Sequence, residues 1–245
     1  MQIFANTDTG RVRSINQDAF CINTLSDGVS LAIVCDGMGG ANAGDIASKT
    51  AVDIVSKYIL NSYAPAMDTD QITRIMGNAI ASANMEIYIS SQKDAQYDGM
   101  GTTIVAAFVR GSEAVICSVG DSRAYLIGED IVQITRDHSV VQTLVESGKL
   151  SPEEAKVHPE KNVITRALGV DNDVLVDSYC VELDSTDKIL LCTDGLSNYV
   201  DKDDIMRIVN DNEPKDVANL LIEQANNGGG RDNITAAVIS GFKKG

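Results

Sequence analysis

Five aspartates in this chain stand at the ends of apolar segments. Asp36 and Asp194 close the runs AIVCD and LLCTD, and a glycine follows each of them. Asp121 follows AVICSVG, while Asp18 and Asp232 come just before AFCINTL and ITAAVIS. Taken alone, either Asp-Gly pair could be an ordinary turn, but the repetition favours a partner that several carboxylates share.

A hard divalent cation is the partner that this pattern predicts. An unpaired carboxylate at the mouth of a core is costly, and convergent carboxylates repel one another. Oxygen ligands suit Mg²⁺ or Mn²⁺, whereas zinc prefers histidine and cysteine. The chain has only two histidines, His138 and His158, so a histidine-rich zinc site is not expected.

The cysteines and the overall charge restrict the class of protein. There are five cysteines with no CxxC pair, most of them inside apolar runs, which indicates buried thiols in a reducing compartment. The net charge of −15 makes nucleic acid and anionic lipid poor partners. The chain opens without a signal-peptide pattern, and no apolar run approaches the roughly 20 residues of a membrane span. We expect a cytoplasmic protein that binds neither nucleic acid nor membrane.

The elements that must position the aspartates are antiparallel strands and paired helices. Apolar stripes at helical spacing run from Ile46 to Ile59 and from Ile72 to Ile87, and Asp70 or Thr69 is expected to cap the second helix. Further helices are expected near 201–211 and 214–226. Strands are expected at 19–25, 30–36, 102–109, 113–119, 123–127, 131–135, 174–183, 188–195 and 234–240.

The four strands between 102 and 135 are joined by turns so short that antiparallel neighbours are expected, as in a meander. The order of elements lacks strict βαβα alternation, which favours antiparallel sheets covered by helix pairs in one domain. Residues 137–169 differ from the rest. They are polar, with a capped short helix at SPEEA and a loop at HPEKN, and we expect an insertion packed loosely on the core.

The glycine-rich stretch GMGGANAG invites a nucleotide-binding interpretation. It lacks the GK[ST] ending of a P-loop, and no spaced GxGxxG follows a strand. Close backbone packing beside the metal site is the expected role.

Seven motifs together resemble the PP2C-type metal-dependent protein phosphatases, most of all the compact bacterial serine/threonine phosphatases. They are RSINQD, CDGMGG, MGTTIVAA, GDSRAYL, HPEKNVITRALG, CTDGLSNYV and GGGRDNITA, in the family's order and approximate spacing. The resemblance covers essentially the whole chain. It implies a single domain at 1–245 with an α+β fold, a four-layer α-β-β-α sandwich of two mainly antiparallel sheets. It also implies that the insertion at 137–169 is a flap beside the active site.

The resemblance also implies which residues hold metal. Asp36 would bridge two ions, with the backbone carbonyl of Gly37 on one of them. Asp18 would hold one ion largely through water, and Asp194 and Asp232 would bind the other.

Three further assignments follow from the same motifs. A third, weaker ion would be served by Asp121 together with Asp194. Arg13 would grip the substrate phosphate, and Asn233 would lie near the water on the metals. Arg13 and Asp18, five positions apart, would then face one phosphate, the first directly and the second through metal and water.

One position departs from a common pattern of the family. Many eukaryotic members carry a histidine after the Asp-Gly of the second motif as a candidate general acid, and this chain has Met38. The leaving alkoxide still needs a proton, which water at the metals or His158 would supply.

The activity that the resemblance implies is hydrolysis of phosphoserine and phosphothreonine by a metal-activated water, with Mn²⁺ or Mg²⁺. The expected partners are phosphorylated substrates of a cognate serine/threonine kinase, and possibly the kinase itself, and the protein is expected to be a monomer. A catalytically silent binding module of the same fold is the alternative, but it should have lost a metal ligand or the phosphate arginine. Nucleotide substrates are disfavoured because tryptophan is absent and no aromatic cluster could stack a base.

Overall fold

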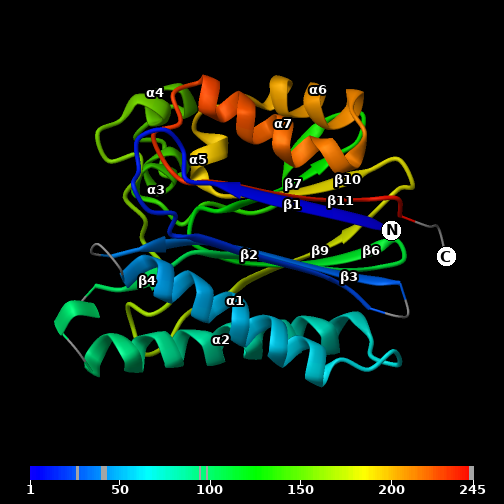
Figure 1. Ribbon diagram of the computed structural model, residues 1–245, viewed down its shortest axis with the longest axis horizontal. Coiled ribbons are helices and arrows are strands. Elements are labelled where there is room, and N and C mark those ends of the chain that lie inside the picture. The colour runs from blue at the N-terminus through cyan, green and yellow to red at the C-terminus, as the bar shows by residue number, and fades with distance from the viewer. Residues whose placement is uncertain (26–27, 40–42, 94, 98, 243–245) are drawn as a thin grey trace.

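The structure is a computed structural model that describes residues 1–25, 28–39, 43–93, 95–97 and 99–242. In this part of the chain the strands form two antiparallel β-sheets that pack face to face, with helices outside each sheet (Figure 1). The expected α+β fold with α-β-β-α layers is confirmed. Residues 40–42 of the glycine-rich stretch lie outside the described residues.

The first sheet holds both ends of the chain. Its order is β1 (Gln2–Asp8), β11 (Ile234–Ser240), β10 (Lys188–Cys192), β7 (Arg123–Ile127) and β8 (Ile131–Gln133). Its outer face is covered by α6 (Lys202–Asp211) and α7 (Pro214–Asn227), which lie above it in Figure 1.

The second sheet lies below the first in the same view. Its order is β2 (Asp18–Thr24), β3 (Val29–Met38), β5 (Ile104–Arg110), β6 (Glu113–Val119) and β9 (Asp177–Glu182), and β4 (Gly101–Thr102) pairs with β3. Its outer face is covered by α1 (Ala43–Ser62) and α2 (Thr69–Lys93). The remaining short elements are η1 (Ala95–Tyr97), α3 (Val140–Glu146), α4 (Pro152–Val157) and α5 (Asp194–Ser197).

Strand β3 shows how the layers are built from the sequence. Its residues Val29 to Cys35 are all buried, because alternate side chains of a strand point to opposite faces and both faces are covered. Ala32 and Val34 face the other sheet, where they join an intersheet cluster with Leu191 and Ile239. The next residues in alternation, such as Ile33, pack on the helices instead.

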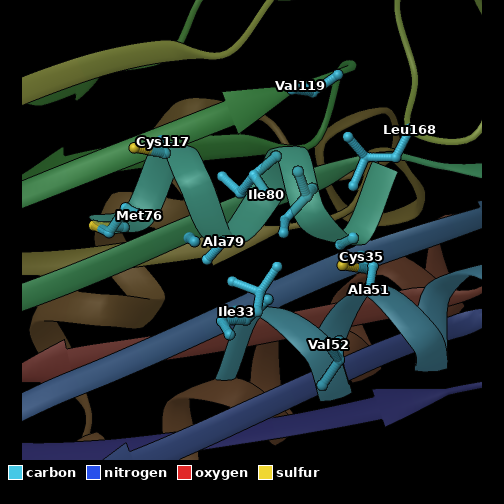
Figure 2. Close-up of a cluster of buried hydrophobic side chains, with 14 of the residues drawn as sticks. Ile33, Cys35, Ala51, Val52, Met76, Ala79, Ile80, Cys117, Val119 and Leu168 are labelled. Carbon is cyan, nitrogen blue, oxygen red and sulfur yellow. The ribbon is translucent and has the colours of Figure 1, made fainter. Parts of the chain in front are cut away.

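Figure 2 shows this second cluster, in which Ile33 and Cys35 face α1 and α2. The helical stripes expected from the sequence supply the partners, among them Ala51 and Val52 on α1 and Ile80 on α2. Burial of both faces makes β3 a central strand, and it carries Asp36 and Gly37 at its end.

The expected meander is wrong at one connection. β6 pairs with β5 and β9 in one sheet, whereas β7 pairs with β10 and β8 in the other. The short segment Gly120–Ser122 therefore crosses between the sheets instead of making a hairpin. Four residue steps from Val119 to Arg123 span up to about 14 Å, enough for the roughly 10 Å between packed sheets. This crossing carries Asp121.

The start of α2 also differs from the prediction. Neither Asp70 nor Thr69 caps it; the cap is Asp68, whose Oδ1 accepts a hydrogen bond from Gln71 N at 2.8 Å. The Gln71 side chain accepts in return from Asp68 N at 2.9 Å. This reciprocal capping box satisfies two backbone donors, which explains why Asp68 serves as the cap.

Strand β1 was not anticipated, because its residues, QIFANTD, alternate only weakly between apolar and polar. The short helix at SPEEA is confirmed as α4, with Ser151 and Glu154 forming a capping box. Within the described ranges, no helix is both long enough and apolar enough to cross a membrane.

The glycine-rich stretch brings β3 and α1 into backbone contact. A β-carbon on Gly44 would lie 2.7 Å from the carbonyl carbon and oxygen of Gly37, and one on Gly37 would overlap the carbonyl oxygen of Gly44. This close approach is the role expected for the stretch, and only glycine permits it. It sets the position of Gly37 beside Asp36.

We predict opposite effects for two glycine-to-alanine changes. Gly44→Ala should lower the free energy of unfolding by about 1–3 kcal/mol, because the methyl group must push two backbones apart. Gly77→Ala is the matched control on α2, where a β-carbon meets nothing within 4 Å. It should raise the free energy of unfolding by about 0.5–1 kcal/mol. Urea denaturation measures both, and an unchanged or more stable Gly44→Ala protein would contradict the close-packing argument.

Candidate active site

Strand pairing brings the five aspartates to one end of the sandwich, the end at which β10 runs into α5 in Figure 1. Asp18 and Asp36 are direct cross-strand partners in the β2–β3 register. In the other sheet Cys192 pairs with both Ala236 and Arg123, so Asp194, Asp232 and Asp121 all lie just beyond the same end. The convergence expected from the strand ends is therefore present in the geometry.

Asp18 is buried and has one carboxylate oxygen satisfied and one not. Its Oδ2 accepts hydrogen bonds from the hydroxyls of Thr193 at 3.0 Å and Thr235 at 2.6 Å. Its Oδ1 is buried and has no hydrogen-bond partner in the structure. Burial, reinforced by the charges of Asp194 and Asp232, raises the pKa of Asp18 to about 7. An unpaired buried oxygen of this kind fits a cation or a cation-bound water.

Asp36 is held through its backbone, which leaves its carboxylate available. Its N–H donates to Thr103 Oγ1 at 3.0 Å, and its carbonyl accepts from Thr102 Oγ1 at 2.8 Å and from Thr103 N at 2.9 Å. Burial raises the pKa of Asp36 well above its usual range, and the charges of the other four aspartates of the cluster raise it further. Asp36 thus lies within electrostatic reach of every other member.

On the side of the first sheet, the carboxylates of Asp194 and Asp121 also repel their neighbours in the cluster. Burial, followed by the charge of Asp194, raises the pKa of Asp121 to about 8. Burial and the charge of Asp232 also raise the pKa of Asp194, whose carboxyl lies at hydrogen-bond distance from that of Asp36. Asp36, Asp121 and Asp194 each keep part of their surface open to solvent, so an ion can reach them.

The donor set fits one or more hard divalent ions. All the clustered donors are oxygens, one of them is buried without a partner, and their mutual repulsion is what a cation would remove. In the described residues, no three acidic, histidine or cysteine side chains already surround one point as a finished ligand set. The aspartates are gathered without being closed on a single point, which is compatible with ligation through water.

Arg13 faces this cluster from the loop before β2. One of its Nη atoms lies 2.9 Å from Asp232 Oδ2, and its side chain is 52% exposed. The charges of Asp36 and Asp194 also act on the guanidinium. The structure therefore brings Arg13 together with the aspartates, as expected, and pairs it with Asp232.

Asn233 holds the loop that carries Arg13. Its Oδ1 accepts from Gln17 N at 2.8 Å, and its Nδ2 donates to the carbonyls of Thr9 at 2.9 Å and Ile15 at 3.0 Å. Its amide is thus bonded to loop backbone at both its oxygen and its nitrogen. Asn233 positions the loop from beside Asp232.

Several residues that support the site did not emerge from the sequence. Thr193 and Thr235 orient Asp18, and Thr103 ties the backbone of Asp36 to the hydroxyl of Ser122 at 2.7 Å, next to Asp121. The signal was a threonine adjacent in sequence to a motif aspartate or glycine, as in CTDG, GTT and DNIT. Such small hydroxyls are as typical of turns as of a site, so type and spacing alone did not separate the two.

A cleft of about 850 Å³ opens from Asp121 and Asp194. Its walls come from α3, α4 and the following loop on one side and from 197–203 on the other, and Lys156, Lys161 and Lys202 line it. The segment 137–169 therefore borders the aspartate cluster, although it is anchored: His138 is buried at its start and Leu168 near its end.

His158 is not among the residues that line this cleft. It ends α4, and its ring Nδ1 accepts from Glu160 N at 3.2 Å within its own loop. Among the residues that the structure describes, His158 is the one predicted site residue that is not brought to the aspartates.

Comparison with known proteins finds relatives that are protein phosphatases. The protein phosphatase 2C family matches residues 10–214. A serine/threonine phosphatase stp of Listeria innocua is 39% identical over 235 residues, which is 95% of this chain and 93% of that protein.

Solved structures agree with this. The serine/threonine phosphatase Stp1 from Staphylococcus aureus superposes with a TM-score of 0.91 at 37% identity, covering 98% of this chain and 94% of that one. The catalytic domain of the serine/threonine protein phosphatase PstP in complex with two manganese ions gives 0.84 at 33% identity, with 97% and 96% covered.

We predict that the metal-free protein loses stability as the pH rises from about 4 to about 8. An unfolded aspartate ionises near pH 4, whereas Asp18 and Asp121 keep their protons until about pH 7 and about pH 8. Between these values the folded state binds more protons, so the free energy of unfolding falls by about 1.4 kcal/mol per pH unit for each such group. Urea denaturation in EDTA at pH 5.5, 6.5 and 7.5 measures the slope.

Two variants make this test specific. Asp36→Asn removes the carboxyl group at the centre of the cluster, whose raised pKa makes the folded state bind a proton that the unfolded state has lost. It should therefore flatten the slope, raise the stability in EDTA at pH 7.5 and abolish stabilisation by added Mn²⁺. Asp53→Asn, whose side chain is 68% exposed on α1, changes the net charge equally and should retain the wild-type slope. An Asp36→Asn protein that is less stable than wild type in EDTA at pH 7.5 would refute carboxylate repulsion at this site.

Proposed function

This chain belongs to the protein phosphatase 2C family, and from that premise we propose that its clustered aspartates hold the ions that activate water against a phosphoserine or phosphothreonine ester. The chain is a metal-dependent protein serine/threonine phosphatase, a hydrolase of phosphoric monoesters. The observation that carries the site assignment is the buried Oδ1 of Asp18, unpaired among carboxylates that repel one another. We further propose that 1–245 is one domain with a flap at 137–169.

Four of the five aspartates have a proposed part in holding two core ions, Mn²⁺ or Mg²⁺. Asp36 would contribute to both ions and the backbone carbonyl of Gly37 to one of them, Asp18 would serve one ion largely through water, and Asp194 and Asp232 would bind the other. The PstP structure that holds two manganese ions supports this choice of metal. When bound, two such ions supply a nucleophilic water at neutral pH and neutralise phosphoryl oxygens.

Asp121 and Asp194 are proposed to hold a third, weaker ion. Their mutual repulsion supports this, since Asp194 is the charge that raises the pKa of Asp121 most. Asp121 is the member of the cluster carried by the crossing between the sheets, which sets it apart from the cross-strand pair Asp18 and Asp36.

Arg13 is proposed to bind the substrate phosphate. The planar guanidinium offers several N–H donors in a fork and keeps its charge at any working pH. Asp232 holds one side of this fork, and because the Arg13 side chain is 52% exposed, its other N–H donors remain open to solvent beside the aspartates. Asn233 contributes by fixing the backbone of the loop that presents Arg13.

Protonation of the leaving alkoxide is assigned to water at the cluster. His158 was the other candidate, but its ring is bonded within its own loop and it does not line the cleft. Met38 offers no proton. A silent regulatory module is disfavoured because the aspartates and Arg13 are all retained.

The substrates are proposed to be proteins phosphorylated by a serine/threonine kinase of the same cell, including the kinase itself. The lysines along the cleft offer a place for the phosphorylated segment of such a protein. We propose that the enzyme works as a monomer in the cytoplasm, in keeping with its five free thiols.

Phosphate release from a phosphothreonine peptide tests the proposed function directly. Turnover should require Mn²⁺, vanish in EDTA, and fall at least about 100-fold in Asp194→Asn, since even outer partners of a metal are worth 10–100-fold. Asp53→Asn should retain wild-type turnover. A folded protein that binds Mn²⁺ without turning over the peptide would instead support the silent-module alternative.

The flap should matter more for protein substrates than for small ones. Val140 N donates to Val163 O at 2.9 Å, and Ser139 pairs with Ile164, so residues 141–162 form a loop whose ends are adjacent. Replacing 141–162 with a short Gly-Ser linker should lower kcat/KM for a phosphoprotein about tenfold more than for p-nitrophenyl phosphate, as expected for one lost docking contact. Equal losses on both substrates would contradict a role in substrate selection.

A further inference from the structure

A buried histidine outside the aspartate cluster is hydrogen-bonded to the backbone of the loop that carries Asp121. The side chain of His138 is only 1% exposed. The ring Nδ1 of His138 accepts a hydrogen bond from Gly120 N at 3.0 Å. The backbone N–H of His138 donates to Gly120 O at 2.9 Å. His138 and Gly120 are therefore bonded to each other twice.

The geometry fixes the tautomer of the ring. A backbone N–H can only donate, so Nδ1 of His138 must be unprotonated, and the neutral ring carries its hydrogen on Nε2. That hydrogen points to Asp177 Oδ2 at 3.2 Å. Burial lowers the pKa of His138, and the nearby charge of Arg166 acts in the same direction against Asp177. The neutral ring is the form that can accept the hydrogen bond from Gly120 N.

Asp177 is itself anchored on the far side of the ring. Arg166 donates to Asp177 Oδ1 at 2.6 Å and to the carbonyl of Leu175 at 3.0 Å. The Arg166 nitrogen also lies 3.1 Å from Nε2 of His138, a contact that is not a hydrogen bond when Nε2 carries its hydrogen. Hydrogen bonds thus link Arg166, Asp177 and His138 in series, and the series ends at the backbone amide of Gly120.

The peptide at Gly120 needs such an anchor. Gly120 has φ +103°, and a β-carbon there would meet Thr103 at 2.6 Å, so the backbone runs close against Thr103 in a left-handed conformation. On the other side of Asp121, the hydroxyl of Ser122 is bonded to that of Thr103 at 2.7 Å. The residue between these two anchors is the proposed ligand of the third ion.

We propose that His138 is a positioning residue: its Nδ1 holds the Gly120–Asp121 peptide so that the Asp121 carboxylate is presented to the third ion. This inference rests on the proposed function, in which Asp121 is a ligand. It assigns to the histidine a role through the backbone, with no contact to substrate.

Two substitutions separate the two faces of the ring. In His138→Asn the side-chain oxygen can occupy the place of Nδ1, so the acceptor for Gly120 is kept and the contact with Asp177 is lost. In His138→Gln the amide lies near the place of Nε2, so the contact with Asp177 is kept and the acceptor for Gly120 is lost. Both residues are polar and smaller than the imidazole, which makes them matched controls for loss of packing.

The first readout is the Mn²⁺ concentration that gives half-maximal hydrolysis of p-nitrophenyl phosphate, with bound core ions counted by titration calorimetry. His138→Gln should raise that concentration about tenfold, on the order of one lost buried hydrogen bond, while both core ions stay bound. His138→Asn should stay within about threefold of wild type. Equal shifts in both variants would show a packing role only and overturn the proposal, and so would a shift confined to His138→Asn.

The second readout needs neither metal nor activity. In metal-free, ¹⁵N-glycine-labelled protein, the Gly120 amide should keep its proton shift and its slow hydrogen exchange in His138→Asn and lose both in His138→Gln. Unchanged Gly120 behaviour in His138→Gln would overturn the proposal at its first step.

Asp121→Asn distinguishes this inference from the proposed function beneath it. If its Mn²⁺ dependence matches wild type, the third-ion assignment fails, and the role of His138 toward that ion fails with it. If Asp121→Asn shifts the dependence and His138→Gln does not, only the role of His138 is overturned.

Discussion

The repulsion among five carboxylates at one end of the sandwich is the constraint on which the rest of the structure depends. Burial and mutual charge raise the pKa of Asp18, Asp36, Asp121 and Asp194, so without a cation the cluster destabilises the folded state. A bound cation would remove this repulsion and stabilise the folded state. The extensively buried strands on both sides make this possible, since they hold the strand ends in place whether or not an ion offsets the charge.

The fold meets this constraint with neutral hydroxyls and backbone groups, and with few cations. Thr193 and Thr235 bind only one oxygen of Asp18, which leaves the other aimed without a partner. Thr102 and Thr103 bind the backbone of Asp36 and leave its carboxylate to the site. A lysine or arginine in these places would neutralise the aspartates and weaken their attraction for metal. Two arginines do act on the cluster: Arg13, which comes from an exposed loop and pairs with Asp232, and Arg123, which is itself paired with Asp137.

Much of this site could be predicted from the sequence, because an apolar run followed by Asp-Gly marks a strand end wherever the strand lies. The helices α1 and α2 could be predicted as well, because the spacing of their apolar residues is a property of each segment alone. The crossing at Gly120–Ser122 could not be predicted. A short turn has the same composition whether the next strand pairs with its neighbour or with β10, nearly 70 residues away. The cap at Asp68 was missed because Asp68, Thr69 and Asp70 are all suitable cap residues, and only the bonds to Gln71 select among them.

The crossing explains why the same few residues serve both structure and chemistry. Asp18 and Asp36 come from one sheet, while Asp194 and Asp232 flank strands of the other, so the cluster lies across the seam between the sheets. A chain that changes sheets at that seam places Asp121 there without an additional loop. This crossing requires glycine at position 120, and it leaves a backbone amide that must be satisfied inside the protein. His138, at the start of the segment 137–169, satisfies that amide, and so the fold ties the base of this segment to the loop that carries Asp121.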